Sequence, residues 1–397
     1  MFSKDRPLLW AFSFLALAVC AWVIWSDAHP AYSDYQAQFR ALIEERFGPE
    51  RALATPVGLR QVWVESAGRV DRCTSCHLGL TWEGLGDAPQ PFASHPADYL
   101  ETHPVEEFGC TACHGGQGFA TRLPEAHGWV EHWGDPLLDS KLGQDYRMQD
   151  EWAFLEIKCN TCHRYQRQTE GAEHINRGKQ LVRDKGCRAC HVINKRGGSI
   201  GPDLTYVGDK PPENYDYSRL TTIPSFFSWQ VAHLQKPKSY SPDTVMPDFG
   251  FNTEEARSIG LLLMSWRDLD LPLAMYPGGV IRDIPTEEEL ERERMMREGE
   301  GRFFVENTCF ICHDVSSLGV ESATKIGPDL ALAVEDAPKR FGRTLESFLL
   351  NPTGTMQVVL SKQIELSRQE RLEAVRLLEI AYEKYKAQQA QEQAAEN

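Results

Sequence analysis

The first apolar run of the chain covers residues 7–25, where only Ser13 is polar. Its length approaches what an α-helix needs to cross the hydrocarbon core of a bilayer. A cleaved signal peptide would show a small-residue cleavage site after this core, whereas residues 21–25 continue apolar. We therefore expect a retained transmembrane anchor over residues 1–27. A lipid anchor on Cys20 stays open as an alternative.

The charges on either side of the apolar run predict its orientation. Lys4 and Arg6 precede the run, and Asp27 follows it. Because basic residues collect on the cytoplasmic side of a membrane helix, we expect a cytoplasmic N-terminus and export of the rest of the chain. The expected location is therefore the bacterial inner membrane, with a single pass and the main domains in the periplasm.

Beyond the anchor, the polar and apolar pattern divides the chain into further segments. A helix around Tyr35–Phe47, broken at Gly48-Pro49, predicts a stalk over residues 28–66. The next hundred residues are dense in glycine, proline and histidine and show no long periodic runs. The remaining expected segments are a loop-rich domain over residues 67–170, helical domains over 171–275 and 287–397, and a linker over 276–286.

Composition excludes one class of partner and leaves the others open. The chain has 397 residues, of which 42% are hydrophobic and 25% charged, with a formal net charge of −15. An acidic chain of this kind does not favour nucleic acid binding. The charge agrees with a cationic partner and equally with an ordinary solvated surface.

The cysteines indicate the chemistry. Ten of the eleven cysteines fall in five C-x-x-C-H units, and only Cys20 lies outside them. In this motif the two thiols attach a haem covalently, and the adjacent histidine is the proximal ligand of its iron. Zinc sites, disulfide scaffolds and iron–sulfur sites do not require a histidine after every second cysteine. The five units are Cys73/Cys76/His77, Cys110/Cys113/His114, Cys159/Cys162/His163, Cys187/Cys190/His191 and Cys309/Cys312/His313.

Five motifs predict five covalently bound haem c groups. In residues 67–170 we expect the macrocycles to replace an apolar core, so that this segment does not fold without them. The expected fold is mainly α with much irregular loop. It comprises one N-terminal transmembrane helix, a haem-packed triheme domain and two further all-α domains.

The last two domains repeat one order of elements. Each begins with a helix that leads into its C-x-x-C-H motif, continues with Gly-Pro-Asp-Leu and a methionine, and closes with a helix. This order resembles the class I cytochrome c domain and covers about half the chain. The resemblance implies that the carbonyl groups of Pro202 and Pro328 accept hydrogen bonds from the proximal histidines. Such bonds orient the imidazole and raise its basicity.

The distal ligands of the last two haems are expected to be methionines. After His313 the chain has no histidine and one methionine, Met356, in the turn-rich loop 351–356. A lysine ligand or an open coordination position stays open as the alternative to Met356. For the fourth haem Met246 is preferred, because it lies in a proline-rich loop before the closing helix, as in the class I pattern. Methionine ligation raises the reduction potential, so these haems are expected to be the high-potential end. The competitors at the fourth haem are His233, Met264 and Met275.

The first three haems have histidines nearby instead of methionines. His95, His103 and His127 precede proline or glycine, and such rigid settings suit ligands presented from loops. We therefore expect bis-histidine ligation by these three, with His132 and His174 as reserves. The pairing of each distal histidine with a haem stays open.

Segment 70–128 combines two C-x-x-C-H motifs with a series of short elements: Val70-Asp71-Arg72-Cys73, His95-Pro96, His103-Pro104, Phe108-Gly109-Cys110, Gly115-Gly116-Gln117-Gly118 and Ala126-His127-Gly128. Together with the preceding anchor and the stalk pattern Tyr35-Gln36-x-x-Phe39, it resembles the triheme part of membrane-anchored multihaem cytochromes that accompany bacterial quinol:cytochrome c oxidoreductases of the bc type. The alternative complex III family also has a pentahaem subunit with one anchor. The resemblance implies electron transfer from a membrane quinol-oxidising complex, of the cytochrome b/Rieske or alternative complex III type. The expected acceptor is a soluble cytochrome, a copper protein or a terminal oxidase.

Two other functions stay open. A haem enzyme of the nitrite reductase or peroxidase type needs an iron with an open coordination position, and distal candidates suffice for all five irons here. A direct quinol dehydrogenase needs haems against the membrane, whereas about 47 residues separate Trp25 from Cys73. Both observations favour an electron-transfer subunit over a catalyst acting alone.

Overall fold

The computed structural model describes residues 6–129, 136–197, 201–244, 246, 248–322, 325, 327–362, 364 and 366–396. The chain is mostly helical, with two short two-stranded sheets among these residues. It divides into two compact units, Met1–Cys159 with Asp270–Gly279, and Asn160–Leu269 with Val280–Asn397. The boundary lies inside helix α9 (Glu156–Cys162), which carries the third C-x-x-C-H motif.

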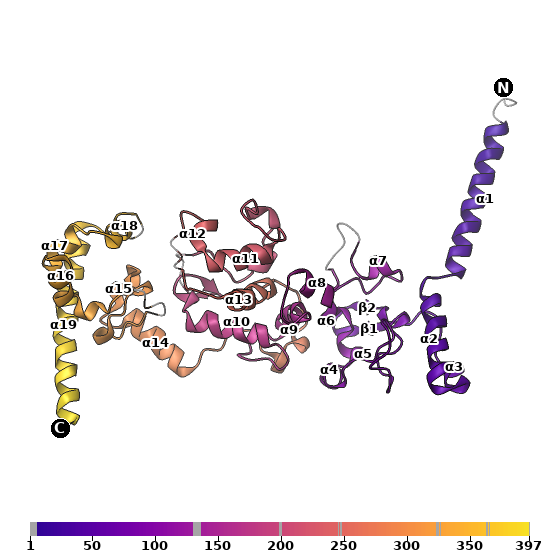
Figure 1. Ribbon diagram of the computed structural model, residues 1–397, viewed down its shortest axis with the longest axis horizontal. Coiled ribbons are helices and arrows are strands. Elements are labelled where there is room, and N and C mark those ends of the chain that lie inside the picture. Colours follow the sequence, from indigo (N-terminus) through magenta and orange to yellow (C-terminus); the bar gives the residue numbers. More distant parts are fainter. Residues whose placement is uncertain are drawn as a thin grey trace. The chain divides into compact units, whose positions relative to one another are not determined.

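The first unit begins with an apolar helix that the rest of the protein does not cover. Helix α1 (Arg6–Ala28) has no buried residue along its length (Figure 1). It is long and apolar enough to cross a membrane. Cys20 is exposed on this helix.

The segment predicted as a stalk shares an apolar core with the loop that follows the first motif. Helix α2 (Tyr32–Phe47) ends before Gly48, whose φ of +90° suits glycine, and α3 (Pro49–Ala54) follows, so the predicted break is confirmed. Phe39 is fully buried, and its ring meets Trp82 and Phe92 with centroids 5.5 Å apart in each case. Helix α2 therefore packs on the loop that follows the first motif.

The rest of the first unit is built from short elements joined by loops. Strands β1 (Val62–Val64) and β2 (Arg69–Asp71) form an antiparallel hairpin, with Val62 opposite Asp71. The sheet ends directly before the first motif. The other helices and 3₁₀ turns are η1 (Glu65–Ala67), η2 (Cys73–Ser75), α4 (Ala97–Thr102), α5 (Val105–Phe108), α6 (Thr111–His114), α7 (Leu123–Ala126), α8 (Ser140–Asp145), η3 (Ala153–Leu155), η7 (Leu273–Met275) and η8 (Pro277–Gly279).

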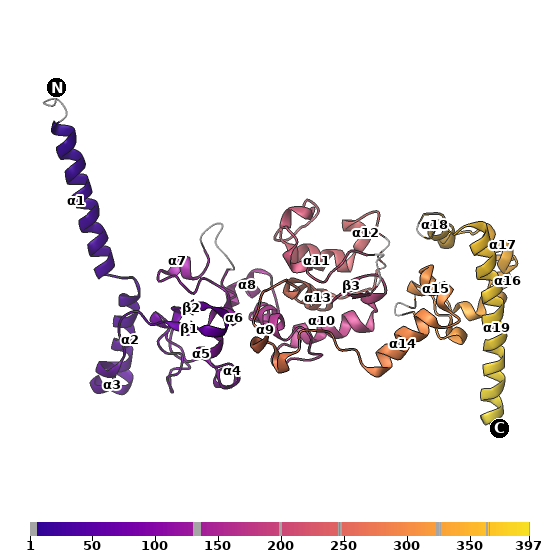
Figure 2. The same ribbon diagram turned by 180° about the vertical axis from the view of Figure 1, so that it is seen from behind.

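The first half of the second unit is a helix pair with a third helix on it. Helices α10 (Glu173–Asp184) and α13 (Thr253–Ser265) lie side by side in both views (Figures 1 and 2). They approach closely because Gly178 has no side chain; a Cβ there would lie 2.6 Å from the Ser258 carbonyl oxygen. The remaining elements are η4 (Cys187–Ala189), β3 (Val192–Ile193), β4 (Arg196–Gly197), η5 (Val207–Asp209), η6 (Pro212–Asn214), α11 (Phe226–Gln235) and α12 (Pro237–Tyr240).

The second half of this unit surrounds a separate apolar cluster. Fully buried Phe304, Val315 and Val320 belong to it, together with side chains from the closing helix α19 (Arg368–Glu396). Helix α19 is tied to the loop after the fifth motif by Ser317, whose hydroxyl donates to the Ala381 carbonyl at 2.6 Å. The other elements are α14 (Glu287–Glu298), α15 (Arg302–Glu306), η9 (Cys309–Ile311), η10 (Ser316–Leu318), η11 (Leu330–Leu332), α16 (Ala333–Phe341), α17 (Leu345–Leu350) and α18 (Thr355–Lys362).

One local expectation needs correction in this half. The loop expected over residues 351–356 ends at Gly354, and Met356 lies in the first turn of α18. The segment from Ala387 belongs to α19, which continues to Glu396. Alanine, glutamine and glutamate are good helix formers, which explains the length of this helix.

Candidate haem attachment sites

All five C-x-x-C-H motifs lie on a turn of helix. The backbone N–H of the histidine donates to the first cysteine carbonyl at 2.9 Å for His77 and His191, 3.0 Å for His114 and 3.1 Å for His313. Residues three and four apart share one face of such a turn, so both thiols and the imidazole project to the same side. The structure describes all eleven cysteines, and none of them forms a disulfide. The donor set therefore fits a group that takes two thioether links and one nitrogen ligand.

Cys113 departs from the other cysteines of the motifs. The side chain of Cys113 is exposed, whereas those of the other nine motif cysteines are half-buried. The reason is local. Cys113 lies on α6, a helix of four residues with no buried side chain, which ends at Gly115. The polypeptide alone therefore does not cover this thiol, and the assignment of Cys113 depends on its spacing from Cys110 and His114.

The fourth and fifth motifs show how the proximal imidazole is held. His191 Nδ1–H donates to the Pro202 carbonyl, and His313 Nδ1–H donates to the Pro328 carbonyl, each at 2.8 Å. The predicted role of the two Gly-Pro-Asp-Leu segments is thus confirmed. Since Nδ1 is occupied, Nε2 is the nitrogen that remains for a metal.

The same segments form a cradle that only glycine can provide. A Cβ on Gly201 would lie 2.6 Å from Nδ1 of His191, and a Cβ on Gly327 would lie 2.7 Å from Nε2 of His313. Burial lowers the pKa of both histidines, against the opposing effect of the proline carbonyls. The imidazoles are therefore neutral near pH 7, as a metal ligand must be.

A buried carboxylate joins the first and second motifs. Asp71 is 1% exposed and accepts from the backbone N–H groups of Cys110 and Thr111 at 2.7 and 3.1 Å. The Thr111 hydroxyl donates to it as well, at 3.0 Å. Asp71 lies two residues before Cys73 in the sequence, and its carboxylate accepts the hydrogen bonds of backbone N–H groups at the start of the second motif. Gly109 and Gly118 leave no room for a Cβ beside its oxygens.

Two pairs of histidines face each other in the first unit. The rings of His77 and His127 have centroids 6.4 Å apart and an interplanar angle of 35°. Those of His95 and His114 are 6.1 Å apart at 90°. Burial, with added effects of His127 and His114, lowers the pKa of His77 to about 4. Burial also lowers the pKa of His114 and of His127.

The third motif is held differently. His163 Nδ1 lies 2.6 Å from Oε1 of Gln166. On the same helical turn Asn160 is fully buried and donates to Oγ of Ser265 at 2.7 Å. Arg164, 8% exposed, donates to Oδ1 of Asn194 at 2.7 Å. Residues 160–164 are therefore built into the second unit, although the sequence grouped this motif with the first two.

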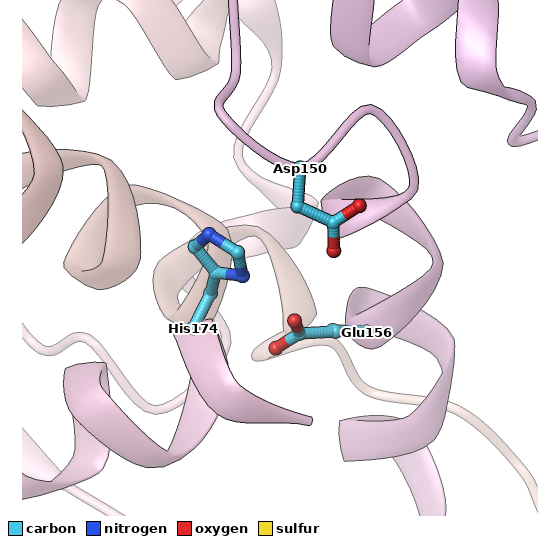
Figure 3. A group of neighbouring side chains, drawn as sticks. All are labelled: Asp150, Glu156 and His174. Carbon is cyan, nitrogen blue, oxygen red and sulfur yellow. The ribbon is translucent and has the colours of Figure 1, made fainter. Parts of the chain in front are cut away.

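The remaining histidine candidates lie at helix ends or outside the description. His103 follows α4, with Nδ1 3.0 Å from the Thr102 hydroxyl and its ring 5.1 Å from that of Phe108. His132 lies outside the described residues. His174 is half-buried in the first turn of α10 and is drawn with Asp150 and Glu156 in Figure 3. Because those two carboxylates belong to the first unit and His174 to the second, the three carry no metal assignment.

The methionine candidates are half-buried in the second unit. Met246 lies in the loop before α13, where its N–H donates to the Thr244 hydroxyl at 3.1 Å. Met356 packs against the cluster that also contacts Cys309 and Ile311. Of the competitors, Met264 is half-buried on α13, and Met275 is buried in the first unit.

His233 has a setting that the sequence did not indicate. Its ring stacks on Trp229 with centroids 4.7 Å apart, and its buried Nδ1 has no hydrogen-bond partner in the described structure. Burial, followed by the effect of His191, lowers its pKa to about 4. Sequence reasoning also missed Asp71, Asn160 and Arg164. These are polar residues without a motif of their own, whose partners lie far along the chain.

Comparison with known proteins identifies one part of the chain. Residues 175–265 match the cytochrome c family, and this stretch contains the fourth motif, Gly201-Pro202 and Met246. No curated protein and no solved structure matches the chain. The chain therefore carries a cytochrome c domain, which binds haem c covalently and has an electron-transfer role.

Proposed function

We propose that this chain is a membrane-anchored c-type cytochrome that carries five covalently bound haem c groups and passes electrons from a quinol-oxidising membrane complex to a periplasmic or terminal-oxidase acceptor. The observation that carries the proposal is the repetition of one attachment turn at five places, each with two cysteine thiols and a histidine on one side. The fourth of these lies in the stretch that matches the cytochrome c family.

The residues around each motif prepare the histidine for ligation. When bound, the haem iron supplies a one-electron couple. Burial keeps His77, His114, His191 and His313 neutral. The proline carbonyls at the fourth and fifth sites make the proximal imidazoles more basic, which favours the ferric state. Met246 and Met356 as distal ligands would favour the ferrous state and place the exit of the electron at these two sites.

The donor and the acceptor follow from the anchor and from the resemblance of segment 70–128. Helix α1 would hold the protein at the membrane surface, where a cytochrome b/Rieske or alternative complex III type partner oxidises quinol. The charge of −15 suits an acceptor that presents a basic surface, such as a soluble cytochrome. A copper protein or a terminal oxidase is the other class of acceptor.

The haem count and the partner are tested separately. The intact mass of the full chain, purified from membranes in mild detergent, should exceed the polypeptide mass by five haem groups. Replacing both cysteines of one motif by serine should remove one group. Fewer than five additions in the unmodified chain would contradict the count.

Reduction kinetics test the donor. Quinol alone should reduce the isolated chain slowly, and the native membrane complex should reduce it rapidly in a reaction blocked by inhibitors of quinol oxidation. Rapid reduction by quinol without a partner would instead support a direct quinol dehydrogenase. Carbon monoxide binding to the reduced native chain in stoichiometric amount would support a haem enzyme.

A further inference from the structure

The first unit brings together two histidine pairs whose spacing is that of trans ligands on one metal. A histidine nitrogen lies about 2 Å from a coordinated metal ion and about 1 Å from the centre of its own ring, so trans ligands have ring centres about 6 Å apart. The two observed separations are 6.4 Å for His77 with His127 and 6.1 Å for His95 with His114. Each pair contains one proximal histidine and one histidine from a loop.

We propose that His127 is the distal ligand at the first attachment site and His95 the distal ligand at the second. The assignment rests on the proposed function, because it requires a haem at each of these motifs. The ligands cross over along the sequence. His127 follows the second motif but serves the first, and His95 lies between the two motifs and serves the second.

Further contacts of His95 and His127 support the assignment. His95 Nδ1 lies 2.9 Å from the Pro96 carbonyl, so Nδ1 carries the proton and Nε2 is left for the iron. This is the arrangement that His191 and His313 show with Pro202 and Pro328. His127 follows α7, and its ring meets that of Trp129 nearly at a right angle, with centroids 5.2 Å apart. Both loop histidines are thus oriented by their own neighbours.

The backbone around Asp71 explains why the crossover is possible. The carboxylate holds the start of the second attachment turn beside the strand that leads into Cys73. In addition, the Arg72 N–H donates to the Gly118 carbonyl at 2.9 Å, and the Gln117 N–H donates to the Ala126 carbonyl at 2.8 Å. These bonds connect the first motif to the segment that ends in His127. The two sites therefore form one cluster with interlocked ligands.

The ring angles give the two sites different spectroscopic signatures. Perpendicular imidazole planes on a low-spin ferric iron produce a highly anisotropic electron paramagnetic resonance signal, whereas planes closer to parallel produce a rhombic signal. The angle of 90° assigns the anisotropic signal to the second site, and the angle of 35° assigns a rhombic signal to the first.

The test compares His95→Ala and His127→Ala in the full chain, with His29→Ala as the control because that ring stacks on Trp25 instead. We expect His95→Ala to lose the anisotropic signal and His127→Ala to lose one rhombic signal. In each variant one further iron should bind carbon monoxide, and added imidazole should restore the lost signal. The control should keep all signals.

The identity of the iron is checked by removing the first site with Cys73→Ser and Cys76→Ser. In that background His127→Ala should expose no further iron, and His95→Ala should still expose one. The opposite result, or unchanged spectra in both single variants, overturns the pairing.

The intact mass of the protein distinguishes failure of the ligand pairing from failure of the proposed function. Five haem additions with unchanged spectra would refute only the ligand pairing, and fewer than five would refute the proposed function itself. If a variant does not accumulate, His95→Met and His127→Met keep a ligand in place and should shift the spectrum of the same iron.

Discussion

Replacing Gly201 by alanine should disturb the proximal ligand of the fourth site without touching the motif itself. The new Cβ would lie 2.6 Å from Nδ1 of His191, whereas ordinary contact begins at 3.4 Å. If the ring withdraws until Nδ1 reaches that contact distance, Nδ1 moves by about 0.8 Å. A movement directly away from the Pro202 carbonyl would lengthen the bond from 2.8 Å to about 3.6 Å, which is no longer a hydrogen bond.

Two consequences follow from this displacement. Overpacking costs about 1–3 kcal/mol of folding free energy. The lost hydrogen bond is worth about 0.5–1.5 kcal/mol, and because it favours the ferric state, its removal should raise the reduction potential. With 59 mV per 1.4 kcal/mol for one electron, the rise is at most about 20–60 mV.

The assay is a spectroelectrochemical titration of the full chain, combined with thermal unfolding followed in the Soret band. Gly327→Ala should produce the same pair of effects at the fifth site, where the Cβ would lie 2.7 Å from Nε2 of His313. Gly86→Ala is the control, since the nearest atom to its Cβ is Oγ of Ser94 at 3.8 Å. The steric argument fails if Gly201→Ala and Gly327→Ala leave potentials and stability indistinguishable from this control.

Three further substitutions test other parts of the structure. Asp71→Asn replaces a carboxylate that accepts hydrogen bonds from three donors. It should destabilise the first unit by about 2–4 kcal/mol in chemical denaturation. A loss of less than about 0.5 kcal/mol would show that the carboxylate does not join the two motifs. Phe39→Ala removes a fully buried ring and should cost about 3–5 kcal/mol, whereas Leu53→Ala, at a side chain 78% exposed, should change stability by less than about 0.5 kcal/mol. His233, whose pKa is lowered from 6.5 to about 4, binds its proton more readily in the unfolded chain, so stability should fall as pH drops from 6.5 to 4, by up to about 3 kcal/mol. His233→Phe should remove this fall in stability between pH 6.5 and pH 4. The same pH dependence of stability in the variant and the unmodified chain would show that His233 does not cause it.

What the sequence predicts well in this protein is what depends on neighbouring residues. A C-x-x-C-H motif places its ligands on one helical turn by spacing alone. The break at Gly48 follows from the conformational freedom of glycine before proline, and the structure confirms it. The proline carbonyl that accepts the imidazole hydrogen bond lies 11 residues after His191 in the fourth motif and 15 residues after His313 in the fifth. Both prolines belong to the order of elements that the two domains repeat, so the sequence pattern predicts them.

What the sequence could not predict depends on long-range packing between segments that lack periodicity. Asp71 accepts a hydrogen bond from Cys110, which lies 39 residues further along the chain. A single acidic residue before a cysteine does not indicate that its carboxylate is buried. The same holds for Arg164 and Asn160, which anchor the third motif in the second unit. The Pro-Thr-Gly before Met356 predicts a loop there, but the loop ends at Gly354 and α18 begins at Thr355.

The distribution of buried apolar residues leads to a prediction about folding without the cofactor. Between Phe92 and Leu138 none of the described hydrophobic side chains is buried, although this stretch holds the second motif and three predicted ligands. By contrast, α13 alone buries Ile259 and Leu261–Leu263. A segment without an apolar core cannot offset the entropy of ordering its backbone, so under the proposed function the macrocycles would supply the buried surface there. We expect limited proteolysis of haem-free chain, produced in cells that lack haem attachment, to cut residues 93–129 first and to spare α10 and α13. Equal protection of both segments would show that the polypeptide orders this region by itself.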